Sequence, residues 1–186
     1  MVTRSASPQG YGHRMNHLEQ LVSEWLQYRG YFVRQSVAVG ARAKGGFEGE
    51  LDVVALNPVT QHLLHVECSL DALSTEQRQL RFSGKFERGR KYIKDAFRGI
   101  ELPETLEQVL VLQFASGNVR SIGGARLVTV REFVHEMFDG LKGTSPASKA
   151  VPSNLPLLRT IQLAADATRI RANGHRIISE AQTSEH

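Results

Sequence analysis

Two short stretches decide the expected fold: 49–55 (GELDVVA) and 62–69 (HLLHVECS). Both are dominated by β-branched and aliphatic residues, which is typical of strands. Only a short segment lies between them, and it contains Asn57-Pro58, a dipeptide that favours a turn. We therefore expect the two stretches to pair as neighbouring strands of one hairpin.

The hairpin places two carboxylates side by side. Because side chains alternate along a strand, Val53 and Val66 should face one side of the sheet, while Asp52 and Glu67 share the other. Two adjacent carboxylates on otherwise apolar strands repel each other and lose hydration, a cost that a divalent cation removes. Oxygen ligands of this kind suit Mg²⁺ or Mn²⁺. The alternative is a pair of solvent-facing acids on an exposed sheet face.

Further helices and strands are expected on both sides of the hairpin. The predicted order is α-β-β-β-α-β-β-α, an α/β fold with a mixed sheet flanked by helices. The segment 31–70 should form an antiparallel meander, and Ser83-Gly84 is a possible interruption of the long second helix. The expected helices are 16–30, 74–97, 131–138 and 155–170, and the expected strands are 31–39, 50–56, 62–70, 108–115 and 125–130.

The composition divides the chain into segments. We predict a disordered N-terminus over 1–14, an α/β domain over 15–139, a linker over 140–154, a C-terminal helix over 155–172 and a flexible tail over 173–186. The 155–172 helix forms a helical extension, which packs either on the domain or on a partner.

Bulk properties exclude several classes of protein. With 186 residues, of which 41% are hydrophobic, the chain can bury one domain core. No apolar run approaches the ~18 residues of a membrane span. The N-terminus lacks the apolar core of a secretory signal. The single cysteine, Cys68, excludes an intramolecular disulfide and a Cys-rich zinc site, and it fits a reducing cytoplasm.

Positive charge is concentrated in one segment. Between Arg78 and Arg98 there are eight basic residues and two acidic ones, a net charge of +6, whereas the whole chain carries +4. A basic stretch in a nearly balanced protein indicates a polyanionic partner. A solvated helix face is the other interpretation.

Three motifs occur in a fixed order. A helix with Glu19 leads to Gly30-Tyr31; then come Gly49-Glu-Leu-Asp52-Val-Val and Val66-Glu67-Cys68-Ser69. In this order and spacing, 19–69 resembles the PD-(D/E)xK, or restriction-endonuclease-like, nuclease superfamily, particularly its Holliday-junction-resolvase-like and Mrr-like branches. The expected element order extends the resemblance to about residue 139.

The resemblance implies a metal-dependent DNA endonuclease that hydrolyses phosphodiester bonds and needs no organic cofactor. Asp52 and Glu67 would hold Mg²⁺ or Mn²⁺ with the Cys68 carbonyl, and Glu19 would help directly or through water. The ion would lower the pKa of a water molecule and neutralise charge on the scissile phosphate. A homodimer is possible, because many such nucleases cut both strands. On helix signals alone, Glu19 could instead belong to a capping box.

The family's lysine, two residues after the motif Glu, is replaced by Ser69, which cannot supply a positive charge. One interpretation is that a cation from another element replaces it; Lys85 is the first candidate and Lys44 the reserve. The other is a catalytically impaired protein that binds DNA or assembles with partners. A third class is an interaction module that uses the 155–170 helix. The residues expected to contact DNA are Arg42, Lys44, Arg78, Arg81, Lys85 and Arg88.

Overall fold

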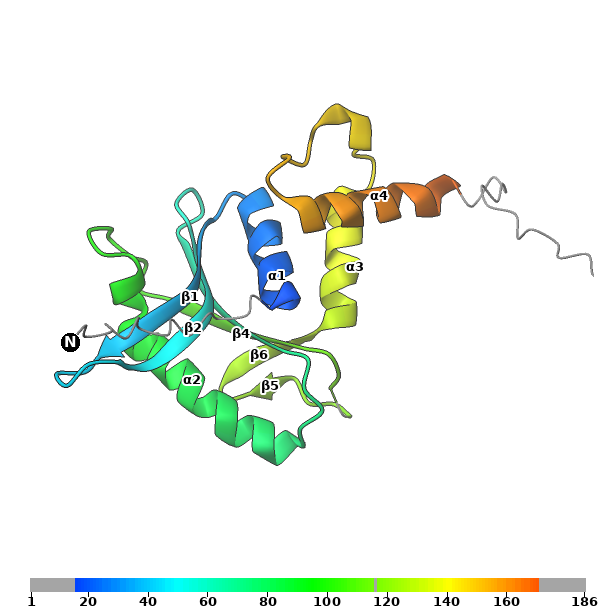
Figure 1. Cartoon of the computed structure of the whole chain (residues 1–186). Coiled ribbons are helices and arrows are strands. Elements are labelled where there is room, and N and C mark those ends of the chain that lie inside the picture. Colours follow the sequence, from blue (N-terminus) through cyan, green and yellow to red (C-terminus); the bar gives the residue numbers. More distant parts are fainter. Residues whose placement is uncertain (1–15, 116, 171–186) are drawn as a thin grey trace, which may run out of the picture.

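The computed structural model describes residues 16–115 and 117–170 (Figure 1). Six strands form one sheet: β1 (Phe32–Ala41), β2 (Phe47–Asn57), β3 (His62–Ser69), β4 (Leu106–Leu112), β5 (Ser121–Ile122) and β6 (Ala125–Thr129). The helices are α1 (His17–Tyr28), α2 (Thr75–Ala96), α3 (Val130–Leu141) and α4 (Pro156–Ile170), with a 3₁₀ turn η1 (Pro146–Ser148). None of the helices within the described part of the chain combines the length and apolarity needed to cross a membrane.

The sheet is mixed, as predicted, with the strand order β1-β2-β3-β4-β6-β5. β1, β2 and β3 form the expected antiparallel meander, and Val53 pairs with Val66. β3, β4 and β6 run parallel to one another. The parallel step from β3 to β4 needs a long crossover, which α2 provides.

The two faces of the sheet carry different helices. α1, α3 and α4 lie on one face, and α2 crosses the other (Figure 1). Val53, Val66 and Cys68 belong to the apolar cluster under α1 and α3, whereas Val54 and Leu63 pack with residues of α2. Along β3 and the second half of β2, side chains therefore point alternately to the two faces of the sheet, as expected from the sequence.

Local signals explain where α2 begins and why it continues. The Ser74 hydroxyl oxygen accepts a hydrogen bond from the Gln77 backbone, and the Gln77 side-chain oxygen accepts one from the Ser74 backbone, which completes a capping box. The possible interruption at Ser83-Gly84 does not occur. The Ser83 hydroxyl donates to the Gln79 carbonyl at 2.6 Å, so its hydrogen-bonding capacity is used inside the helix.

The segment predicted as a linker, 140–154, is packed onto the domain. It contains the end of α3 and η1, and the Val151 side chain is fully buried in the cluster under α1 and α3. Glu24 of α1 accepts a hydrogen bond from the Leu158 backbone at 2.9 Å and so caps the start of α4. α4 therefore packs on α1 and α3 of the same chain, which composition alone did not indicate.

Other differences from the expected elements are small. β1 and β2 extend further into the loop between them, the expected strand at 108–115 begins and ends earlier, and α3 is longer at both ends. The two-residue strand β5 is too short to leave a sequence pattern. The predictions for 1–14 and 173–186, and for the last two residues of the 155–172 helix, lie outside the described residues.

Two glycines in α2 should respond oppositely to replacement by alanine. A Cβ at Gly89 would lie 2.2 Å from His65 Nδ1, inside a buried ring, whereas a Cβ at Gly84 would meet only Arg88 Nη1 at 3.5 Å. Gly84→Ala should raise the free energy of unfolding by about 0.5–1 kcal/mol through helix propensity. Gly89→Ala should lower it by about 1–3 kcal/mol through overpacking. Urea denaturation measures both, and equal effects at the two positions would contradict the close approach at Gly89.

Candidate functional site

Three charged side chains from three elements meet on the α2 face of the sheet. Lys85 Nζ of α2 donates to Asp52 Oδ1 of β2 at 2.8 Å and also to Glu67 Oε2 of β3. The Glu67 side chain is fully buried, and those of Asp52 and Lys85 are 7% and 20% exposed. The structure therefore brings together the two carboxylates and the lysine that the sequence singled out.

Asp52 lies where the β1–β2 hairpin is distorted. Ser36, the β1 residue opposite Asp52, has φ = +49°, a conformation that non-glycine residues rarely adopt. The second Asp52 oxygen, Oδ2, accepts a hydrogen bond from the Cys68 backbone at 3.0 Å. Burial and the nearby Glu67 carboxylate raise the pKa of Asp52 to about 7, although Lys85 and the Cys68 amide act in the opposite direction.

Asp52, Glu67 and Lys85 form a charged cluster, in which Glu67 and Lys85 are the ionised groups. Burial acts to raise the pKa of Glu67, but the hydrogen bond from His65 and the charge and hydrogen bond of Lys85 outweigh it and leave that pKa below its usual value. Burial likewise acts to lower the pKa of Lys85, and the two carboxylates outweigh it and raise that pKa. The lysine is therefore held as a cation beside at least one carboxylate anion.

A buried network fixes the orientation of Glu67. His65 Nε2 lies 2.9 Å from Glu67 Oε1, and His65 Nδ1 lies 3.1 Å from Gln108 Nε2. The Gln108 amide cannot rotate, because its nitrogen donates to the Phe86 carbonyl and its oxygen accepts from Arg90. In the neutral ring, His65 Nδ1 therefore accepts a hydrogen bond, and the ring proton lies on Nε2, from which it is donated to Glu67. Sequence reasoning missed Gln108, whose contact with His65 depends on the β3–β4 pairing.

Ser69, which occupies the position of the family's lysine, contacts a different acid. Its hydroxyl donates to Asp71 Oδ2 at 2.5 Å. Asp71 also pairs with Arg78 and with Arg81. Ser69, the last residue of β3, thus contacts the loop that leads into α2. No sequence pattern indicates that Asp71 organises this loop.

Arg78 is not available to DNA, contrary to expectation. The residue is 4% exposed and donates to the Phe114 carbonyl at 2.9 Å and to the Asp71 carbonyl at 2.7 Å. These bonds tie the start of α2 to the segment after β4 and to the loop after β3. The helix over 74–97 was predicted from the sequence, but the prediction does not reveal that Arg78 near its start is buried. Arg81 is half-exposed on the same side.

Arg88 has an unusual environment beside the cluster. Within the described residues, its Nε atom is buried and has no hydrogen-bond partner. The guanidinium lies against Gly49, where an added Cβ would be 2.5 Å from Nε. Gly49 is thus needed to admit Arg88 on this side of the hairpin, next to the strand that carries Asp52.

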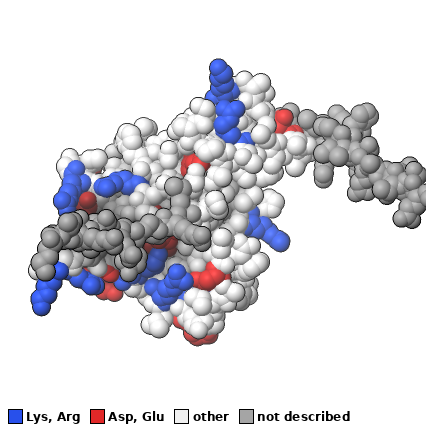
Figure 2. Space-filling model, viewed as in Figure 1, with Lys and Arg blue, Asp and Glu red and all other residues white. Residues whose placement is uncertain are grey.

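The remaining expected DNA contacts, Arg42 and Lys44, are exposed where β1 turns into β2. Several of the basic side chains visible in Figure 2 lie on the side that carries this hairpin and α2, with acidic side chains among them. The surface is therefore mixed in charge rather than uniformly positive.

Glu19 contributes a third acid near the cluster. It is buried in the first turn of α1, where Asn16 caps the helix by accepting from the Leu18 backbone. Burial raises the pKa of the Cys68 thiol well above its usual value, and the charges of Asp52, Glu19 and Glu67 act in the same direction. Even so, nowhere in 16–115 or 117–170 do three or more His, Cys, Asp or Glu side chains converge as a ready metal site.

Comparisons with known proteins do not assign a family or a function to this chain. No protein-family model matches the sequence, and no curated protein matches it. Among solved structures, the chain is similar to a crystal structure of a protein of unknown function, AF1548, with a TM-score of 0.39 and 10% sequence identity. That similarity covers 81% of this chain and 96% of the other. The charged cluster of Asp52, Glu67 and Lys85 is therefore the basis for inferring function.

The raised pKa of Asp52 predicts a pH dependence of stability. In the unfolded chain the carboxyl ionises near its ordinary value of about 4, whereas in the folded chain its pKa is about 7. Between these values the folded protein binds more protons, so the free energy of unfolding should fall as the pH rises. Asp52→Asn removes this contribution, which between pH 5 and 8 amounts to about 3 kcal/mol at most.

Urea unfolding at pH 5 and pH 8, with EDTA present, measures the effect. The pH-dependent loss of stability should be smaller in Asp52→Asn than in the unsubstituted protein. Asp95→Asn, an exposed position on α2, is the matched control and should leave the loss unchanged. Identical pH dependence in Asp52→Asn and the unsubstituted protein would show that Asp52 ionises normally.

Proposed function

We propose that the protein is a Mg²⁺- or Mn²⁺-dependent DNA endonuclease of the PD-(D/E)xK type, whose lysine is supplied by α2 instead of β3. The observation that carries the proposal is the position of Lys85 Nζ, hydrogen-bonded to both Asp52 and Glu67. An acid on β2, an acid on β3 and a lysine beside them are the three charged groups that the resemblance calls for. The mixed sheet with α1 and α2 on opposite faces is compatible with a restriction-endonuclease-like core.

The two carboxylates fit a hard divalent cation. Asp52 Oδ2 is engaged by the Cys68 amide and Glu67 Oε1 by His65, so the two remaining oxygens, Oδ1 and Oε2, converge on Lys85. Mg²⁺ is often held by one or two carboxylates together with substrate phosphate and water. Asp52 and Glu67 would hold the ion, with the Cys68 carbonyl and Glu19 as the further ligands implied by the resemblance. A bound ion would supply Lewis-acid stabilisation of the phosphate charge.

The chain's own groups have distinct roles in this proposal. Lys85 carries the positive charge that Ser69 cannot provide, and it orients a water molecule or a phosphate oxygen next to the carboxylates. His65 keeps Glu67 ionised and aligned through a fixed hydrogen bond. Arg88, a half-buried residue beside Gly49, would contact a phosphate of the DNA backbone through the exposed part of its guanidinium. Arg42, Lys44 and Arg81 are exposed and could extend this contact.

A catalytically impaired DNA-binding or assembly module is the second candidate. It is favoured by the same ion pairs, because Lys85 already pairs with both acids without a metal. The α4 helix is a poor candidate for an interaction module, since its Leu158 is buried against α1 and α3. Metal binding separates the first two candidates, because only the endonuclease requires it.

Cleavage assays test the proposal directly. Supercoiled plasmid, single-stranded DNA and branched DNA are incubated with Mg²⁺ or Mn²⁺, and metal binding is followed by calorimetry. The unsubstituted protein should cut at least one substrate, and Asp52→Ala or Glu67→Ala should abolish cutting and metal binding while circular dichroism stays unchanged. Absence of both cleavage and metal binding in the unsubstituted protein would leave the impaired module as the better account.

Lys85 should matter for the rate more than for affinity. Lys85→Ala should slow cleavage by about 100-fold or more, as expected for a charge that acts in the transition state, and change DNA affinity severalfold at most. Lys94→Ala, an exposed lysine on the same helix, is the matched control and should affect neither strongly. If Lys85→Ala only reduces the salt dependence of DNA binding, Lys85 is a phosphate contact and not a catalytic residue.

A further inference from the structure

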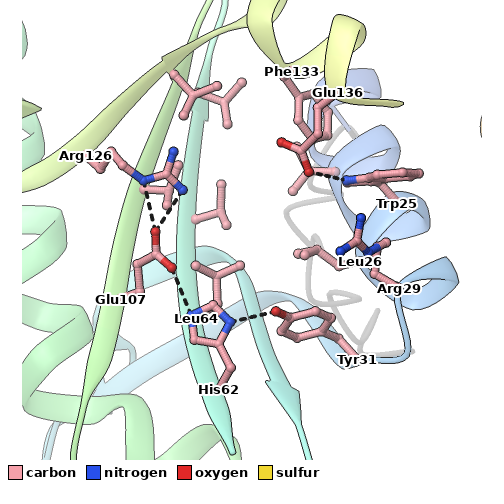
Figure 3. A pocket seen from close by; sticks show the side chains of 15 residues that line it. Trp25, Leu26, Arg29, Tyr31, His62, Leu64, Glu107, Arg126, Phe133 and Glu136 are labelled. Atoms are coloured by element: carbon pink, nitrogen blue, oxygen red, sulfur yellow. Dashed lines mark hydrogen bonds and ion pairs between the residues drawn. The ribbon is translucent and has the colours of Figure 1, made fainter. Parts of the chain in front are cut away.

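A cavity of about 160 Å³ lies on the other face of the sheet, with β3, β4 and β6 on one side and α1 and α3 on the other (Figure 3). Leu64 and Val66 of β3 line it, while the alternating His65 and Glu67 point to the α2 face. The cavity and the carboxylate cluster therefore share a strand but no side chains.

The interior of the cavity is apolar. Its lining includes Leu26, Leu64, Val66, Val109, Val111 and Phe133. An apolar cavity of ~150 Å³ is large enough to hold benzene. Trp25, Tyr31 and Phe133 add aromatic rings to the wall, and these favour offset or edge-to-face contact with a flat ligand.

A hydrogen-bonded chain of polar groups closes one side of the cavity. Tyr31 Oη lies 2.6 Å from His62 Nδ1, and His62 Nε2 lies 2.9 Å from Glu107. Burial raises the pKa of Tyr31, so the phenol stays protonated. The Glu107 carboxylate only accepts, so a neutral His62 ring carries its proton on Nε2, and His62 Nδ1 accepts from the Tyr31 hydroxyl. The Tyr31 oxygen can still accept a hydrogen bond from a ligand. Figure 3 shows Tyr31 and His62 pointing toward each other at this side of the cavity.

The charged groups around the cavity balance one another. Arg126 donates to Glu107 from Nε at 3.0 Å and from Nη2 at 2.8 Å. On the opposite side, Glu136 accepts from Trp25 Nε1 at 3.1 Å, and the Arg29 guanidinium stacks over the Trp25 ring at 5.5 Å (Figure 3). The two arginines and two glutamates sum to zero, so a charged ligand would enter without a matching counter-charge.

We propose that this cavity is a binding site for a small, flat, uncharged aromatic molecule with one hydrogen-bonding substituent. The ring would lie against the apolar interior, and the substituent would donate to the Tyr31 oxygen. The proposal does not depend on the nuclease function, because it uses residues on the opposite face of the sheet.

Trp25 allows a site-specific test, because it is the only tryptophan in the chain and lines the cavity. Its fluorescence, excited selectively at the red edge, is titrated with benzyl alcohol, benzoate and benzylamine, which share one ring and differ in charge. Benzyl alcohol should give a saturable change and bind about tenfold or more tightly than either charged analogue, since an unmatched buried charge costs at least the ~1.4 kcal/mol that tenfold represents.

Two variants locate the binding. Val109→Phe fills the cavity and should abolish the response, whereas Val109→Ala enlarges the cavity and should retain it. Tyr31→Phe should weaken benzyl alcohol about fivefold, the effect of one hydrogen bond, and leave toluene unchanged. The proposal is overturned by any of three results: no saturable change with benzyl alcohol, an equal response in Val109→Phe, or tighter binding of a charged analogue. If Val109→Phe does not fold, the Tyr31→Phe comparison decides.

Discussion

The rest of the candidate site depends on one interaction, the Lys85 ammonium held between two buried carboxylates. Asp52 and Glu67 come from adjacent strands, and their mutual repulsion and lost hydration would oppose pairing of those strands at this point. Lys85 offsets this cost from a helix that must also pack closely on the sheet. Gly89 permits that close approach, and the fixed Gln108 amide holds the neighbouring His65 in place. The charge cluster and the packing of α2 therefore support each other.

The same cluster separates what the sequence could predict from what it could not. Period-two alternation was sufficient to place Asp52 and Glu67 on one face, because the two strands are adjacent in the chain. Lys85 could be nominated because it lies on the basic helix that directly follows the strand of Glu67 in the chain. Gln108 and Asp71 could not be found in this way: their contacts depend on parallel pairing and on a loop, and neither leaves a periodic pattern. Burial of Arg78 was missed for the same reason.

The alternation of side chains along β3 separates the candidate metal site on one face of the sheet from the apolar cavity on the other. The odd-numbered residues of β3, such as His65 and Glu67, face α2 and form a polar, charged network. The even-numbered residues of β3, such as Leu64 and Val66, face α1 and α3 and line the apolar cavity. α4 supports the second face, because the Glu24 carboxylate that caps it belongs to α1. A segment with the composition of a linker is thereby drawn into the core around Val151.

The central claim, that Lys85 neutralises the buried carboxylates, is tested most directly by a double-mutant cycle on the free energy of unfolding. Lys85→Met, Glu67→Gln and the double variant are unfolded with urea at pH 8 in EDTA, where no metal substitutes for the lysine. Lys85→Met leaves two buried carboxylates without their cation, and Glu67→Gln removes one of these carboxylates, so the double variant should be less destabilised than the sum of the singles. The account predicts a coupling energy of about 1–3 kcal/mol. Additive effects, with a coupling energy near zero, would contradict it.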